Sequence, residues 1–95
     1  MATFMTRVEL HDASYSDYEK LHTAMEAEGF DRTITSDDGV TYYLPPAEYY
    51  CDVQLTRQQV LEKAKRAAKT TQKSFSAIVT ESKGITWTGL SKVGS

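Results

Sequence analysis

FMTRVELHDASYSDYE (Phe4–Glu19) is the most informative segment for the fold, because its residue pattern changes from the period of a strand to that of a helix. Its second half is rich in residues that start helices, and Ser16 with Glu19 fits a capping box. Its first half has the period-two pattern of a strand with one covered face, in which Phe4, Thr6, Val8 and Leu10 alternate with Met5, Arg7 and Glu9. The chain is therefore expected to pass from a strand directly into a helix.

The predicted helix ends near Gly29, since glycine adopts the left-handed C-cap conformation without steric cost. Two short strands should follow on either side of DDG at 37–39, a typical hairpin turn. Pro45 and Pro46 then interrupt the strand pattern, because neither donates a backbone hydrogen bond. We expect the strand through 40–53 to bend there and continue, or to become an edge.

A second helix and a last strand complete the pattern. TRQQ at 56–59 fits another capping box, and SFSAIVT at 74–80 alternates again. The order β-α-β-β-α-β is the split βαβ plan. We therefore expect an α+β, ferredoxin-like βαββαβ sandwich, in which two helices cover one face of a four-stranded antiparallel sheet. Residues 1–82 form this single domain, and 83–95 form a C-terminal tail with Trp87, flexible or docked on a sheet edge or a partner.

Composition limits the class of protein. A chain of 95 residues holds one domain, and its lone Cys51 offers neither an intrachain disulfide nor a metal-ligand spacing. No apolar run is long enough to cross a bilayer and the N-terminus lacks a secretory signal, so a cytoplasmic location without membrane contact is expected. The net charge of −2 hides a division, because residues 1–55 sum to −8 and residues 56–95 to +6. That division suits a basic face for a polyanion, or complementary subunit surfaces.

His11 and Asp12 are the first candidate site, at the turn between the first strand and the first helix. A helix cap is the favoured interpretation, since polar side chains there satisfy unpaired backbone N–H groups. In the catalytic interpretation, His11 exchanges a proton with a ribose hydroxyl. Asp12 could instead hold a divalent cation such as Mg²⁺, alone or with a second copy across a dimer axis. No other cofactor is indicated.

Other polar and aromatic residues have a structural explanation beside a functional one. His22 lies on the apolar stripe of the first helix, and Asp37 with Asp38 suits a turn at least as well as a metal. The tyrosines could stack on RNA bases, or divide between the core and an interface; they are Tyr42, Tyr43, Tyr49 and Tyr50. The basic residues of the second helix could contact phosphates or face solvent; they include Lys63, Lys65, Arg66, Lys69 and, beyond its end, Lys73.

The chain from Thr6 to about Val79 resembles the GhoS family of small antitoxins. The resemblance lies in the succession TRVELHDASYSDYEKLHTAMEAEGF, ITSDDGVTYYLP and LTRQQVLEKAKRA. It implies a ferredoxin-like fold similar to a small CRISPR-associated ribonuclease-like subunit. It also implies an endoribonuclease that cleaves the messenger RNA of a membrane-damaging toxin, as in a type V toxin–antitoxin system. Asp12 stands where that family carries an acid, and Arg7 and Arg32 become candidate phosphate contacts.

Two functions follow as expectations. The first is a GhoS-like antitoxin, a homodimer that cleaves or binds single-stranded messenger RNA through Arg7, Arg32, Lys63, Arg66 and Lys69. The alternative is a non-catalytic protein-interaction module of prophage or mobile-element origin, acting as a homodimer. A neighbouring reading frame for a small membrane peptide would favour the antitoxin.

Overall fold

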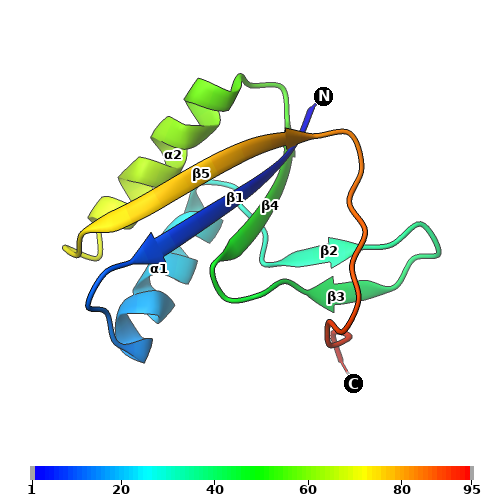
Figure 1. Ribbon diagram of the computed structural model, residues 1–95, viewed down its shortest axis with the longest axis horizontal. Coiled ribbons are helices and arrows are strands. Elements are labelled where there is room, and N and C mark those ends of the chain that lie inside the picture. The colour runs from blue at the N-terminus through cyan, green and yellow to red at the C-terminus, as the bar shows by residue number, and fades with distance from the viewer. Residues whose placement is uncertain (1, 95) are drawn as a thin grey trace.

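A computed structural model describes residues 2–94, and its central strand is β1 (Ala2–Leu10). β1 pairs antiparallel with β4 (Glu48–Val53) on one side and with β5 (Phe75–Ser82) on the other, giving the strand order β4-β1-β5. Figure 1 shows α1 (Tyr15–Ala27) and α2 (Arg57–Lys69) on the same side of this sheet. The molecule is thus a small α+β fold with one helical layer on one sheet.

The alternation predicted for β1 is confirmed. Phe4, Thr6 and Val8 have no exposed surface, whereas Arg7 and Glu9 are exposed on the other face. The helices complete the core on the buried side through the following residues: Leu21, Met25, Val60, Ala64, Ala67 and Ala68. Small alanines on α2 let its backbone lie close to the sheet. Each fully buried large apolar side chain contributes about 1.5–3 kcal/mol to this packing.

Both helices begin at a capping box, although the first box is not the predicted one. Thr56 and Gln59 cap α2 as expected, with Thr56 Oγ1 accepting from the Gln59 N–H at 3.1 Å. At α1 the box is formed by Ser14 and Asp17, so the prediction of Ser16 with Glu19 is wrong. The Asp17 carboxylate accepts from the Ser14 N–H at 2.9 Å. The helix therefore starts two residues earlier, as close to the end of β1 as the turn allows.

The predicted single four-stranded sheet is also wrong. β2 (Thr33–Thr35) and β3 (Thr41–Tyr43) form a separate two-stranded sheet, joined to β4 by a bridge between Asp31 and Tyr50. Pro45 and Pro46 supply the physical reason, since they remove two consecutive donors where the strand would have continued. The Leu44 N–H, the last backbone donor before the two prolines, bonds to the Arg32 carbonyl at 2.8 Å. The hairpin therefore ends short of the main sheet.

The C-terminal segment lies along the free edge of β3 (Figure 1). The Tyr43 N–H donates to the Ser91 carbonyl, and the Val93 N–H donates to the Thr41 carbonyl, each at 2.9 Å. Between these two bonds, Tyr42 and Lys92 form an isolated antiparallel bridge. Backbone pairing thus holds the segment beside the hairpin.

Neither helix among residues 2–94 has the length and apolar character that a membrane span requires.

Candidate functional site

The turn after β1 holds His11 and Asp12, the two residues predicted to be catalytic. The His11 N–H donates to the Ser74 carbonyl at 2.8 Å, and His11 Nε2 lies 3.1 Å from the Ser76 hydroxyl. Asp12 has a φ of +52°, a left-handed conformation that aspartate tolerates better than most residues. The cap of α1 is Ser14, so Asp12 shapes the turn and does not cap the helix.

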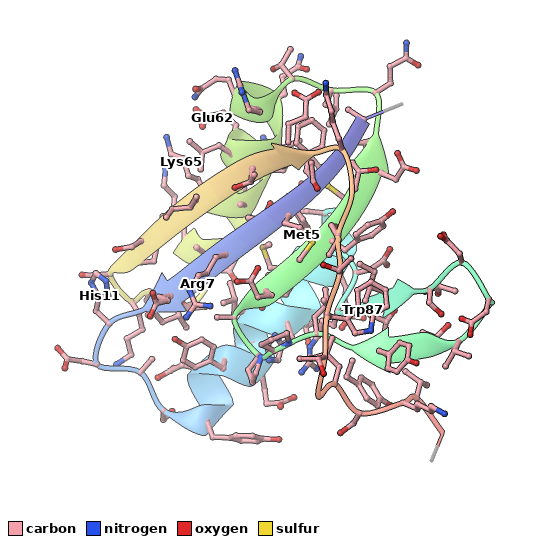
Figure 2. All side chains as sticks on the ribbon, turned by 45° about the vertical axis from the view of Figure 1, so that its right-hand side comes forward. Met5, Arg7, His11, Glu62, Lys65 and Trp87 are labelled. Atoms are coloured by element: carbon pink, nitrogen blue, oxygen red, sulfur yellow. The ribbon has the colours of Figure 1, made fainter. Side chains whose placement is uncertain are left out.

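Both side chains in this turn are exposed, and Figure 2 shows His11 at the tip of the molecule. Asp12 makes no hydrogen bond or ion pair within the described part of the chain. Residues 2–94 contain no group of three or more His, Cys, Asp or Glu side chains that could hold a metal ion. Catalysis and metal binding at this turn therefore stay predictions.

Arg7 and Arg32, predicted as phosphate contacts, line one groove of about 410 Å³. We call it the arginine groove, defined by those arginines with Tyr15, Tyr18, His22 and Pro45; the carboxylates of Glu9 and Glu19 also line it, so the arginines do not act alone there. β1 contributes Arg7, α1 contributes the tyrosines and histidine, and the loop before β4 contributes the proline. The structure thus brings together residues from distant parts of the sequence.

Arg7 is the best-anchored cation of this groove. Its guanidinium lies 3.1 Å from a carboxylate oxygen of Glu48 and 3.4 Å from one of Glu9. The hydrogen bond to Glu48, followed by the charge of Glu9, raises the pKa of Arg7. The Arg7 side chain is nearly half exposed, at 47%, so solvent screens both ion pairs. Such exposure leaves the guanidinium accessible to a competing anion.

A buried hydrogen bond lies beneath the arginine groove. His22 Nδ1 and the Tyr49 hydroxyl are 2.6 Å apart, and both residues are buried. Burial, followed by the positive charge of Arg32, lowers the pKa of His22. Burial also raises the pKa of Tyr49. At neutral pH this pair is therefore uncharged and supports the packing of α1 against β4.

The basic residues of α2 form a second predicted RNA contact, but acids of the other half of the chain neutralise part of it. Arg66 donates two hydrogen bonds to Glu28, at 3.1 and 3.3 Å, and Lys73 lies 3.8 Å from Asp17. These ion pairs join residues of the basic half of the sequence to residues of the acidic half. Lys63 is half-buried and Lys69 is exposed. The division of charge along the sequence is thus partly cancelled in space.

A second ion pair on α2 lies within the helix itself. Lys65 is 3.2 Å from Glu62, one helical turn earlier, and Figure 2 shows both on the outer side of α2. Exposed pairs of this kind contribute at most about 1 kcal/mol.

Cys51 offers no reactive thiolate, because burial raises its pKa to about 11.

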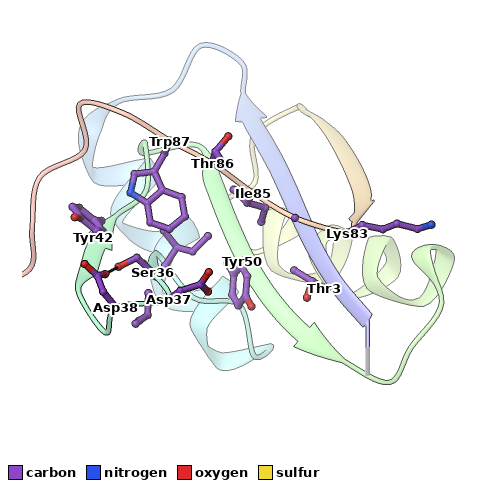
Figure 3. Close-up of a pocket in the computed structure, with 13 residues that line it drawn as sticks. Thr3, Ser36, Asp37, Asp38, Tyr42, Tyr50, Lys83, Ile85, Thr86 and Trp87 are labelled. Atoms are coloured by element: carbon purple, nitrogen blue, oxygen red, sulfur yellow. Dashed lines mark hydrogen bonds between the residues drawn. The ribbon is translucent and has the colours of Figure 1, made fainter.

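A larger cavity, of about 490 Å³, lies between the C-terminal segment and the β2–β3 hairpin (Figure 3). We call it the tail cavity, defined by Trp87, Tyr42, Tyr50, Asp37, Asp38 and Ser36. The rings of Trp87 and Tyr42 meet edge to face, with centroids 5.5 Å apart. Sequence reasoning named the tyrosines, the aspartates and Trp87 separately, and no local signal joined them. Of the other clustered tyrosines, Tyr49 is in the core and Tyr43 is exposed.

No family model matches this sequence, and no curated protein sequence is significantly similar to it.

Proposed function

We propose that this protein binds single-stranded messenger RNA as an antitoxin similar to the GhoS family. The observation that supports this function is the arginine groove, in which two guanidinium groups and two tyrosine rings line one depression. Arginine recognises phosphate through a planar fork of donors, and aromatic rings stack on bases that are not paired. A flexible single strand offers both groups at once.

The groove suggests how one nucleotide would bind. A phosphate would displace the Glu48 carboxylate from Arg7, because both anions present paired oxygens to the same guanidinium. Tyr15 is 81% exposed at the first position of α1, so its ring is accessible to a base. Base stacking on an aromatic side chain contributes about 1–3 kcal/mol. Arg32, which lines the same groove, would contact another phosphate of the strand.

Cleavage of the RNA and an acid at Asp12 are what the family resemblance implies, whereas the role of His11 comes from the chemistry of its imidazole and not from that family. His11 follows β1, the strand that carries Arg7, and would act on the ribose hydroxyl as general acid or base. Asp12 would bind a divalent cation there. The finer fold assignment is likewise a proposal, namely a ferredoxin-like plan in which the prolines separate the β2–β3 hairpin from the sheet.

Fluorescence anisotropy of a short labelled single-stranded RNA tests binding. Arg32→Gln should weaken binding and make its salt dependence shallower by about 0.7 in log–log slope for each lost phosphate contact. Lys20→Gln is the matched control, since it removes an equal charge from an exposed position of α1 outside the groove. Equal affinity for wild type and Arg32→Gln would contradict the proposal.

Cleavage needs a separate assay. Denaturing gels of the same RNA, incubated with wild type, His11→Ala and Asp12→Ala, should show loss of product in each variant, with a Mg²⁺ requirement if Asp12 holds the ion. Binding without cleavage in the wild type would reduce the protein to an RNA-binding antitoxin. Product from both variants at the wild-type rate would remove the turn from the mechanism.

The alternative function, a protein-interaction module acting as a homodimer, is favoured by one observation on the sheet. Ile78 is 65% exposed on the face of β5 that the helices leave uncovered, opposite Arg7 of β1. Figure 2 shows Met5 and Arg7 on this open face. Sedimentation equilibrium should give a dimer for wild type and for Val93→Ser, an exposed apolar position on the C-terminal segment, but a monomer for Ile78→Ser. A monomeric wild type would contradict this alternative and also the homodimer expected for the antitoxin.

A further inference from the structure

We propose that the tail cavity binds an organic cation, an ammonium or guanidinium group on an aliphatic stem. The cavity combines an aromatic wall with carboxylates, which are the two features that attract such a cation (Figure 3). This site is separate from the arginine groove and does not depend on the proposed RNA binding.

The aromatic wall has three rings from three separate segments. Tyr42 belongs to β3, Tyr50 belongs to β4, and Trp87 comes from the C-terminal segment. Figure 3 shows the indole beside Tyr42, with Asp37 and Asp38 at the same end of the cavity. Tryptophan offers the strongest ring face for a cation. All three rings are only partly buried, so their surfaces remain available to a ligand.

The charge of the cavity is carried by Asp37 and Asp38, which differ in their partners. Asp38 accepts a hydrogen bond from the Ser36 hydroxyl, which lowers its pKa, and the charge of Lys92 acts in the same direction. Asp37 is exposed and makes no hydrogen bond or ion pair among residues 2–94. Lys83 also lines the cavity, but Figure 3 shows its ammonium pointing away from the aspartates. Lys92 thus offsets part of the charge of Asp38, and Asp37 supplies the remaining negative charge of the cavity.

These features select among ligand classes. A phosphate or nucleic-acid strand would meet two carboxylates at close range, and like charges repel. A neutral apolar ligand would leave Asp37 without a partner. An organic cation would fit both parts of the cavity, with its charge beside the Asp37 carboxylate and its aliphatic stem against the aromatic rings. A volume of about 490 Å³ is sufficient for such a group together with several carbons of its carrier.

The fluorescence of Trp87 provides a direct assay, because it is the protein's one tryptophan. The probes are choline with its neutral isostere 3,3-dimethylbutanol, and a short arginine peptide with the matching citrulline peptide. We expect a saturable fluorescence change with choline, the arginine peptide or both, and none with the neutral analogues. Preference for choline would identify a free small cation as the ligand, whereas preference for the peptide would identify a protein side chain.

Two charge-neutralising variants complete the test. Asp37→Asn should weaken binding about tenfold, whereas Glu26→Gln, at an exposed position of α1 outside the cavity, should not change it. Circular dichroism melts establish that both variants fold. The proposal is overturned if neither cation gives a saturable change, if the neutral analogues bind as tightly as the cations, or if Asp37→Asn binds like wild type.

Discussion

Replacing Thr6 with valine should stabilise the protein. Thr6 has no exposed surface, and its hydroxyl is the one buried side-chain polar atom within residues 2–94 that lacks a hydrogen-bond partner. Valine has nearly the same shape and carries a methyl group in place of that hydroxyl. An unpaired buried polar group costs about 1–3 kcal/mol. Thr6→Val should therefore raise the free energy of unfolding by much of this amount, and its added methyl group should gain apolar contact in the core.

The surroundings of Thr6 allow this exchange without strain. Thr6 sits in the central strand β1, opposite Tyr49 of β4 and Val79 of β5, and valine favours such positions. For a domain of this size, each kcal/mol raises the melting temperature by about 4–8 °C. Urea unfolding monitored by circular dichroism measures the free energy, and calorimetry measures the melting temperature.

Two matched variants separate the hydroxyl from other effects. Thr80→Val makes the same change at an exposed position of β5, where only strand propensity acts, and should alter stability by less than about 0.5 kcal/mol. Thr6→Ser keeps the unpaired hydroxyl and loses the methyl group, so it should destabilise. If Thr6→Val proves no more stable than Thr80→Val, the buried Thr6 hydroxyl does not lower the free energy of unfolding.

Further predictions concern the buried pair and the helix packing. Tyr49→Phe removes the hydroxyl that lies 2.6 Å from His22 and should cost about 1–3 kcal/mol, whereas Tyr50→Phe should be nearly neutral in the same urea titration. Because burial lowers the pKa of His22, the unfolded chain binds its proton more readily. The contribution of His22 to the free energy of unfolding should therefore be complete above pH ~6.5. Below that pH it should decline by at most about 1.4 kcal/mol per pH unit. NMR titration of the His22 ring measures its pKa, and unfolding at several pH values measures the free energy. Ala64→Leu should destabilise by about 1–3 kcal/mol, because Ala64 is fully buried where α2 lies against the core, and a thermal melt detects the loss.

The first capping box illustrates the limit of local patterns. Ser14 with Asp17 and Ser16 with Glu19 have the same spacing, and both fit the motif. The structure uses the first box, and Lys73, from the turn after α2, lies 3.8 Å from its Asp17 carboxylate. Local spacing alone does not distinguish the two boxes, because such a contact joins segments far apart in the chain.

The two candidate sites depend on still longer-range contacts. Arg7 and Arg32 were predicted as phosphate contacts on the basis of a family resemblance, but their common groove exists only because α1 and the proline loop lie beside β1. Trp87 reaches Tyr42 because residues 91–93 pair with β3. Pairing between backbone segments leaves little trace in the side-chain pattern of either one.

Local sequence patterns correctly predicted which residues of β1 face the core, where α2 begins, and an α+β domain of two helices and several strands. These properties follow from periodicity and from side chains within four residues of one another. Three features appear only in the folded chain. The prolines divide the sheet, acids of α1 and its C-cap pair with bases of α2 and the turn after it, and an indole from the C-terminal segment lines the same cavity as the carboxylates of the hairpin turn. Such contacts join residues far apart in the chain, and their geometry is set by the packing of whole elements.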